Sequence, residues 1–280
     1  YNITIENKNT ENGNWVGYAV IANPAKAPEN EKSKWGMKIS DSTHTSIFTA
    51  ISHHYTALFS EILDNSIQAK EIHLTSKDNT IYTTSGSVTL DADVVNITSE
   101  TGNGIQAQGS KFTINAGETT INVTDDNHAI RVANYTADGR NDSSQEVAIN
   151  TGDLTINASS AIKHGGDSLV KINATGLSKI TGDILVYDNN SQVELSIAGT
   201  NSYLKGAINE NNIKKNGGVT FNLNNAKWIP TGDSSLKKLT ANGGVIDLTV
   251  LDNPKARTSS VPGITIGTGS GSCTFLMSPD

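Results

Sequence analysis

The sequence predicts an all-β protein: a right-handed parallel β-helix with three strands per turn and a period of about 24 residues, together with one N-terminal amphipathic helix. Aliphatic residues recur at that period along most of the chain. The composition favours short strands with tight turns, because 25 glycines, many Asn, Thr and Ser, and only 18% charged residues accompany the Val and Ile. Asn also recurs directly after an interior Ile, in "TIN", "AIN" and "KIN", where we expect corners.

Charge and cysteine content exclude several classes of function. The net charge is −7 and no basic patch is visible, which argues against nucleic acid or an anionic membrane surface as a partner. No apolar run approaches the roughly 18 residues of a membrane-spanning helix. Cys273 is the only cysteine, so an intrachain disulfide and a cysteine-based zinc site are impossible. We expect it to be a small core or loop residue.

Residues 1–70 are expected to form N-terminal turns and a capping helix. "NWVGYAVIAN" and "KWGMKI" are typical of strands in early turns separated by loops. Residues 45–64 are predicted to be the amphipathic helix, with Thr45 as its N-cap and a single apolar face. That face comprises Ile47, Ile51, Tyr55, Leu58, Phe59 and Ile62. An open β-helix end needs a cover, so the helix is interpreted as a cap, with a partner-binding helix as the alternative.

Residues 71–216 are predicted to form the regular coil. When Glu71–Asp93 is aligned with Val94–Gly117, aliphatic positions match. The alignment continues through two further units and a polar insertion at 134–145, which adds about 11 residues to one turn. The expected equivalences are Ile72 with Ile97, Ile81 with Ile105, Leu90 with Ile114, Ile97 with Ile121, Ile105 with Ile130, Ile121 with Ile156 and Ile156 with Ile180, and Ile162 and Ile172 belong to the fourth unit.

This period has a direct physical interpretation. Each unit is too small to bury its own apolar face, whereas stacked units form a continuous core. Strands of successive units would pair in parallel at about 4.8 Å, so each interior side chain lies on its counterpart in the turn below. The coil is expected to be right-handed because parallel crossovers are overwhelmingly right-handed.

Residues 217–280 are expected to form the C-terminal turns. "GGVTFNL" at Gly217–Leu223 and "GGVIDLT" at Gly243–Thr249 lie 26 residues apart and would bracket one turn. Its interior residues would be Trp228, Leu236 and Leu239. The triplet Gly232-Asp233-Ser234 then falls in a turn between two strands of one coil.

This C-terminal block resembles a known family. Asn225-Ala226-Lys227-Trp228, the turn Thr231–Leu236, Leu239-Thr240, Gly243–Asp247, and Gly269-Ser270-Gly271 leading to Phe275-Leu276 are similar, in order, to the end of a pertactin-like autotransporter passenger of type V secretion. The strong match covers about the last 65 residues, and the coil from Ile72 to Ile213 agrees in architecture alone. Cys273 departs from the pattern, because such passengers usually avoid cysteine.

The resemblance implies where the protein acts. It implies export through the outer membrane of a Gram-negative bacterium and display on the cell surface, with membrane contact only through a C-terminal barrel that these residues do not contain. The family includes adhesins, self-associating aggregation proteins, toxins and some hydrolases, so the activity is not defined by membership.

Three stretches imitate catalytic motifs. Gly232-Asp233-Ser234 begins like a chymotrypsin-type nucleophile motif, but Ser235 stands where that motif needs Gly. Gly166-Asp167-Ser168-Leu169 spells an esterase box, yet the matching Asp125 and His128 lie upstream of it instead of downstream. "ALFSEILDNSIQAKEI" resembles the helix of histidine-kinase and Hsp90 type ATPases, with Glu61 and Asn65 as its functional residues, but Thr101 replaces the carboxylate that would bind adenine.

A β-helical polysaccharide lyase or hydrolase is the main enzymatic alternative. It needs carboxylates that converge on Ca²⁺ and a basic residue on the same face. Asp125, Asp126, Arg131 and Asp188 are the candidates, although turns favour acidic residues for structural reasons alone. A third alternative is a secreted toxin or host-receptor ligand.

The sequence therefore predicts a non-catalytic surface adhesin, with no catalytic, cofactor-binding or metal-ligating residue. Its partners would be other copies on neighbouring cells, or a host or matrix protein or glycan, and its role cell aggregation, biofilm formation or host attachment. The insertion is the expected recognition loop, since Tyr and Arg are enriched at binding hot spots. Its candidate residues are Asn134, Tyr135, Asp138, Arg140 and Asn141.

Overall fold

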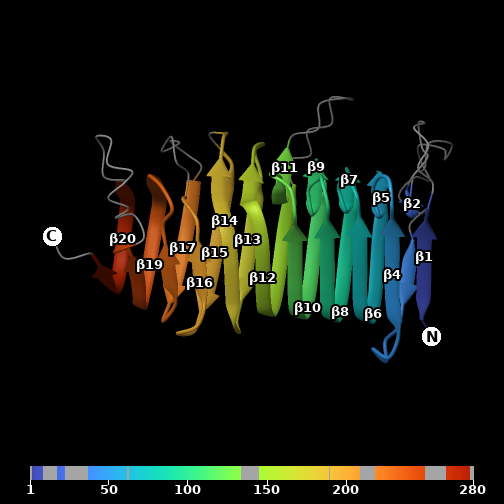
Figure 1. Ribbon diagram of the computed structural model, residues 1–280, viewed down its shortest axis with the longest axis horizontal. Helices are drawn as coiled ribbons and strands as arrows, with labels where there is room; N and C mark the ends of the chain where they lie inside the picture. Colours follow the sequence, from blue (N-terminus) through green and yellow to red (C-terminus); the bar gives the residue numbers. More distant parts are fainter. Residues whose placement is uncertain are drawn as a thin grey trace.

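The computed structural model is all-β, and every strand pairing in it is parallel. The structure describes residues 2–8, 18–22, 37–61, 63–133, 145–188, 190–208, 218–249 and 263–277. The strands follow one another along a single stack, with β1 at one end and β20 at the other (Figure 1). This arrangement is consistent with a β-helix.

The strand bounds show two kinds of element, short strands of three to seven residues and longer ones of up to 19 residues. In chain order they are β1 Ile3–Asn7, β2 Val20–Ala22, β3 Lys38–Ser40, β4 Ile47–Ser52, β5 Leu58–Glu61, β6 Asp64–Ser76, β7 Ile81–Thr84, β8 Ser87–Ser99, β9 Ile105–Gln108, β10 Lys111–Val123, β11 His128–Ala133, β12 Glu146–His164, β13 Leu169–Ala174, β14 Ser178–Val186, β15 Gln192–Ala198, β16 Tyr203–Lys205, β17 Gly218–Asn224, β18 Lys227–Ile229, β19 Ser234–Asp247 and β20 Ile264–Leu276.

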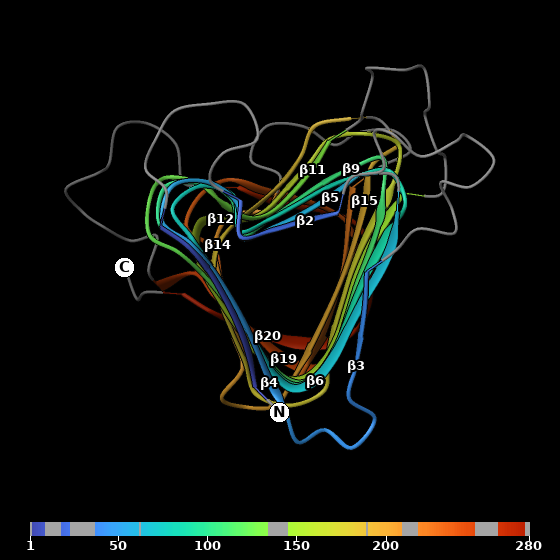
Figure 2. The same cartoon turned by 90° about the vertical axis from the view of Figure 1, so that its right-hand side faces the viewer.

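The cross-section is triangular (Figure 2). We define three faces by their strands. The first face contains β3, the first halves of β6, β8, β10 and β12, and then β13, β15 and β17. The second contains β4, the later parts of those long strands, the start of β14, and β16 and β18. The third contains β2, β5, β7, β9, β11 and the ends of β12 and β14.

The long strands run around a corner between the first and second faces. In β6, Ala69 and Ile72 are buried, while Lys70 and Glu71 between them both point outward. Two successive outward residues interrupt the in–out alternation of a flat strand, so the chain bends there. The same four-residue pattern recurs in β8 around Asp93. Two of the short strands expected from the sequence are thus joined into one long strand that bends at this corner.

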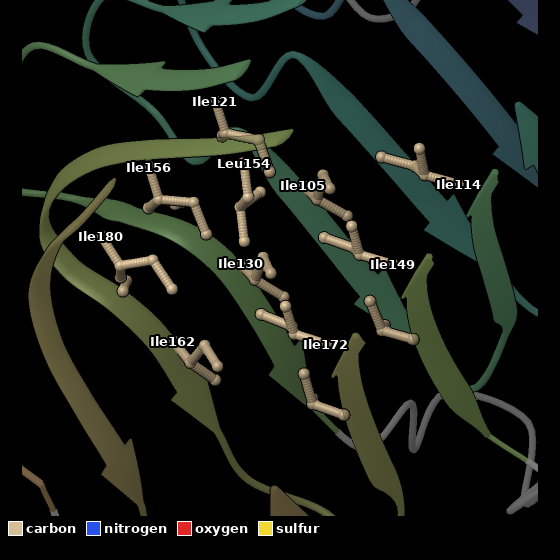
Figure 3. Close-up of a cluster of buried hydrophobic side chains, with 14 of the residues drawn as sticks. Ile105, Ile114, Ile121, Ile130, Ile149, Leu154, Ile156, Ile162, Ile172 and Ile180 are labelled. Atoms are coloured by element: carbon tan, nitrogen blue, oxygen red, sulfur yellow. The ribbon is translucent and has the colours of Figure 1, made fainter. Parts of the chain in front are cut away.

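Columns of aliphatic side chains fill the interior. Ile97 pairs with Ile121, which pairs with Ile156, which in turn pairs with Ile180, and each is at most 1% exposed. Figure 3 shows part of this core. These equivalences are confirmed, as are those of Ile81 with Ile105, Leu90 with Ile114, and Ile105 with Ile130. The core is therefore continuous along the stack, as the period predicts.

Two expected registers are wrong. Ile72 pairs with Val95, and Leu74 is the residue that pairs with Ile97. Gly217-Gly218 and Gly243-Gly244 do not occupy equivalent positions either. Equivalent positions would pair residues 26 apart, whereas Phe221 pairs with Leu239, 18 residues later. Trp228, Leu236 and Leu239 are nevertheless buried, as expected.

The predicted helix at 45–64 is wrong, because this segment forms β4 and β5. Phe48, Ala50 and Ser52 alternate inward and pair with Ile72, Leu74 and Ser76 of β6. The apolar spacing fitted both a helix and a pair of strands, and pairing with the next coil favours the strands. The described residues contain no helix long and apolar enough to cross a membrane.

Candidate functional site

The predicted recognition loop lies outside the described residues. Asn134, Tyr135, Asp138, Arg140 and Asn141 all belong to it, so their arrangement stays a prediction. Its flanks are described: β11 ends at Ala133 and β12 begins at Glu146. In the sequence, the insertion therefore follows β11 and precedes β12.

The Gly232-Asp233-Ser234 triplet forms a structural corner. The Ser234 side chain is 3% exposed. Its Oγ accepts a hydrogen bond from the Ile208 amide at 3.0 Å and donates one to the Gly232 carbonyl at 3.1 Å. Asp233 Oδ1 accepts the Gly263 amide at 2.6 Å. Both side chains thus satisfy backbone groups that β-ladders leave unpaired.

The esterase-like string Gly166–Leu169 brings Ser168 near His164 and Asp188, but their hydrogen bonds do not form a catalytic triad. His164 is buried, and its Nε2 donates to the Ser168 carbonyl at 2.9 Å instead of accepting from the hydroxyl. Its Nδ1 has no hydrogen-bond partner in the described part of the chain, whereas Asp188 accepts the Gly166 amide. Burial lowers the pKa of His164, which favours the neutral ring. A serine nucleophile needs a histidine nitrogen at its hydroxyl.

The ATPase-like residues are also structural. Asn65 is buried in β6, where its Oδ1 accepts the Met37 amide at 2.7 Å and its Nδ2 donates to Ser60 Oγ at 2.5 Å. Glu61 ends the short strand β5. No helix joins the two residues, so the resemblance to a nucleotide-binding helix has no structural counterpart.

The lyase candidates do not converge. Asp125 and Asp126 lie exposed in the turn before β11, and Asp188 lies exposed in the turn after β14. Arg131 points outward from β11 on the third face. In the described part of the chain, no group of three or more His, Cys, Asp or Glu side chains could hold a metal ion.

The second face carries an uncharged array that we call the Thr/Asn face. In β8, β10 and β12, the two residues that flank the buried Ile column point outward; Asn157 is exposed and the others are partly exposed. The sequence signal was present in the strings "NIT" and "TIN", although these residues were not singled out as a site. The Thr/Asn face comprises Asn96, Thr98, Thr120, Asn122, Thr155 and Asn157.

Hydroxyl groups of this face are available to a partner. Asn157 donates to Asn122 at 2.9 Å, and Asn96 contacts His73 Nδ1 at 3.1 Å, so the amides are partly engaged within the molecule. The hydroxyls of Thr98, Thr120 and Thr155 form no hydrogen bond with any described residue. Parallel pairing places successive rungs about 4.8 Å apart. The face is thus a flat, regular row of hydrogen-bonding groups.

A second polar column lies on the first face. Asn115, Asn150 and Asn173 are paired in register, and Asn150 donates to Asn115 at 3.1 Å. Further along, Asn222 donates to Ser196 at 2.9 Å. Because these amides donate hydrogen bonds within the molecule, they stabilise the stack, and fewer of their polar groups remain for a partner.

Cys273 lies in β20 opposite Gly244, half-buried against the core. Its position agrees with the expected role of a small core residue.

Comparisons with known proteins found no match. No family model, no curated protein and no solved structure matches this chain.

Proposed function

We propose that this chain is the passenger of a pertactin-like autotransporter and acts as a non-catalytic adhesin on the cell surface. The resemblance of residues 225–276 to the end of such passengers motivates the first part. We further propose that the stack is a right-handed β-helix with three strands per turn and a period of about 24 residues. Spacings of 23 and 24 residues between many paired positions support this period.

The Thr/Asn face supports self-association as the mode of adhesion. It is flat and uncharged, and three of its hydroxyls have no hydrogen-bond partner among the described residues. A second copy laid against it could bond to them, and each such bond contributes about 0.5–1.5 kcal/mol. Many weak contacts between two cells add up to strong adhesion through avidity.

The experiment displays the chain on a non-aggregating bacterium and measures how fast the culture settles. The double substitution Thr98→Lys with Thr120→Lys places like charges on both partners of a self-association. We expect it to abolish settling. Thr89→Lys with Thr113→Lys is the matched control, because these threonines point outward from the same strands, β8 and β10, on the first face. We expect this control to settle as the unmodified chain does.

Two results would contradict the proposal. If the unmodified chain does not make cells settle, self-association is wrong. If both double variants settle equally well, another surface mediates the contact. Surface display of each variant is measured with an antibody to an added tag, so that loss of export is not mistaken for loss of adhesion.

A further inference from the structure

The third face carries two neighbouring cations. Arg131 of β11 and Lys163 of β12 are register partners, both outward-facing and partly exposed. Their strands lie about 4.8 Å apart. Arg131 is the only arginine among the described residues, in a chain whose net charge is −7. Among the described residues, no other two cations are register partners, although Lys237 and Lys238 are consecutive in β19.

Among the described residues, neither cation has an acidic partner. No carboxylate of the described residues lies within 4.0 Å of Arg131 or Lys163. Asp188, on a neighbouring turn, accepts the Gly166 amide instead, and Asp126 lies in the exposed turn before β11. Like charges directly opposite each other on paired strands are destabilising. An anion bound between them would remove this repulsion.

The neighbouring His128 responds to the same cations. Its pKa is lowered to about 4, mainly by burial and then by the positive charges of Lys163 and Arg131, against the opposing effect of Asp126. The positive potential of the pair therefore exceeds that of the nearby carboxylate at this position.

An exposed aromatic ring adjoins the cations. Tyr187 follows β14, and its amide donates to the His164 carbonyl at 2.9 Å, which holds it on the turn next to Lys163. Its ring is 51% exposed, and Lys163 Nζ lies 5.5 Å from the ring centroid. Arg131, Lys163 and Tyr187 thus lie on three successive rungs, about 10 Å along the stack, and Tyr187 is two residues beyond Leu185, the register partner of Lys163.

We propose that Arg131, Lys163 and Tyr187 form a binding site for an acidic saccharide. The guanidinium and the ammonium bind carboxylate or sulfate groups through charge-assisted hydrogen bonds. The Tyr187 ring packs against the apolar side of a sugar ring, and its hydroxyl supplies a further polar contact. The site lies on a different face from the Thr/Asn face, so it does not depend on the proposed self-association.

Calorimetric titration of the purified chain tests the site with three probes. A galacturonate hexasaccharide supplies carboxylates, a heparin hexasaccharide adds sulfates, and maltohexaose is neutral. We expect one or both anionic probes to bind saturably and maltohexaose not to bind. Arg131→Gln and Lys163→Gln should each weaken binding about tenfold or more, and Tyr187→Ala should weaken it as well.

The control variant is Lys179→Gln, which removes one exposed cation from the second face and forms no ion pair with any described residue. Its affinity should equal that of the unmodified chain. The proposal is overturned if neither anionic probe binds, if maltohexaose binds equally well, or if Lys179→Gln weakens binding as much as Lys163→Gln. Urea unfolding of each variant confirms that it is folded. If Arg131→Gln is unfolded, the single variants Lys163→Gln and Tyr187→Ala test the proposal.

Discussion

Gly152→Ala is expected to destabilise the fold, because the coils are tightly stacked at the corner where Gly152 lies. Gly152 lies where β12 turns from the first face to the second, directly above Gly117 of the coil below. A Cβ on Gly152 would lie 2.4 Å from the Gly117 carbonyl oxygen. Favourable heavy-atom contacts lie near 3.5 Å or more, so this contact is about 1 Å too short.

The clash cannot be relieved cheaply, because the contacted atom belongs to the backbone. The flanking residues Thr151 and Asp153 pair with Ala116 and Glu118, so a shift of the chain would disturb the ladder on both sides. Insertion of a methyl group into such packing typically costs about 1–3 kcal/mol of unfolding free energy. We expect a loss of this size for Gly152→Ala.

Gly269→Ala is the matched control. A Cβ there would meet no atom within 4 Å, and the position is exposed in β20. Without a clash, the substitution should leave the stability unchanged or raise it by up to about 1 kcal/mol, because alanine restricts the unfolded chain. Urea unfolding followed by far-UV circular dichroism measures both variants. If Gly152→Ala unfolds at the same urea concentration as Gly269→Ala, the inferred stacking of these corners is wrong.

The remaining predictions concern a buried serine, Ser234, and a half-buried histidine, His128. Ser234→Ala removes the acceptor of the Ile208 amide and should lower the free energy of unfolding by about 1–3 kcal/mol, measured by thermal unfolding. Ser235→Ala should leave it unchanged, because the buried Ser235 hydroxyl has no hydrogen-bond partner among the described residues; equal effects of the two substitutions would refute this. The pKa of His128 is lower in the folded chain, about 4, than the usual 6.5, so the unfolded chain binds the proton first as pH falls. Stability should therefore decline between about pH 6.5 and pH 4 by about 1 kcal/mol after solvent screening, and His128→Asn should reduce this decline; an unchanged pH profile would contradict it.

Several features of the fold could be predicted from the sequence because they repeat locally. Most interior positions carry an aliphatic side chain, and parallel stacking puts the next one a full coil later. The spacing of Ile81 and Ile105, or of Ile97 and Ile121, therefore already indicates which residues pair. Gly232 and Asp233 could be assigned to a turn by the same reasoning, whereas Ser234 begins β19. No periodic pattern in the sequence indicates the function, which is therefore stated as a proposal.

Other features depend on contacts between distant residues. Ile47 and Leu58 fit a helical face as well as two strands, and only pairing with the next coil decides between them. The same dependence on pairing explains the register of the last turns. Arg131, Lys163 and Tyr187 lie far apart in sequence, and no local pattern connects them. Coiling places them on adjacent rungs, so their proposed common role is visible only in the tertiary structure.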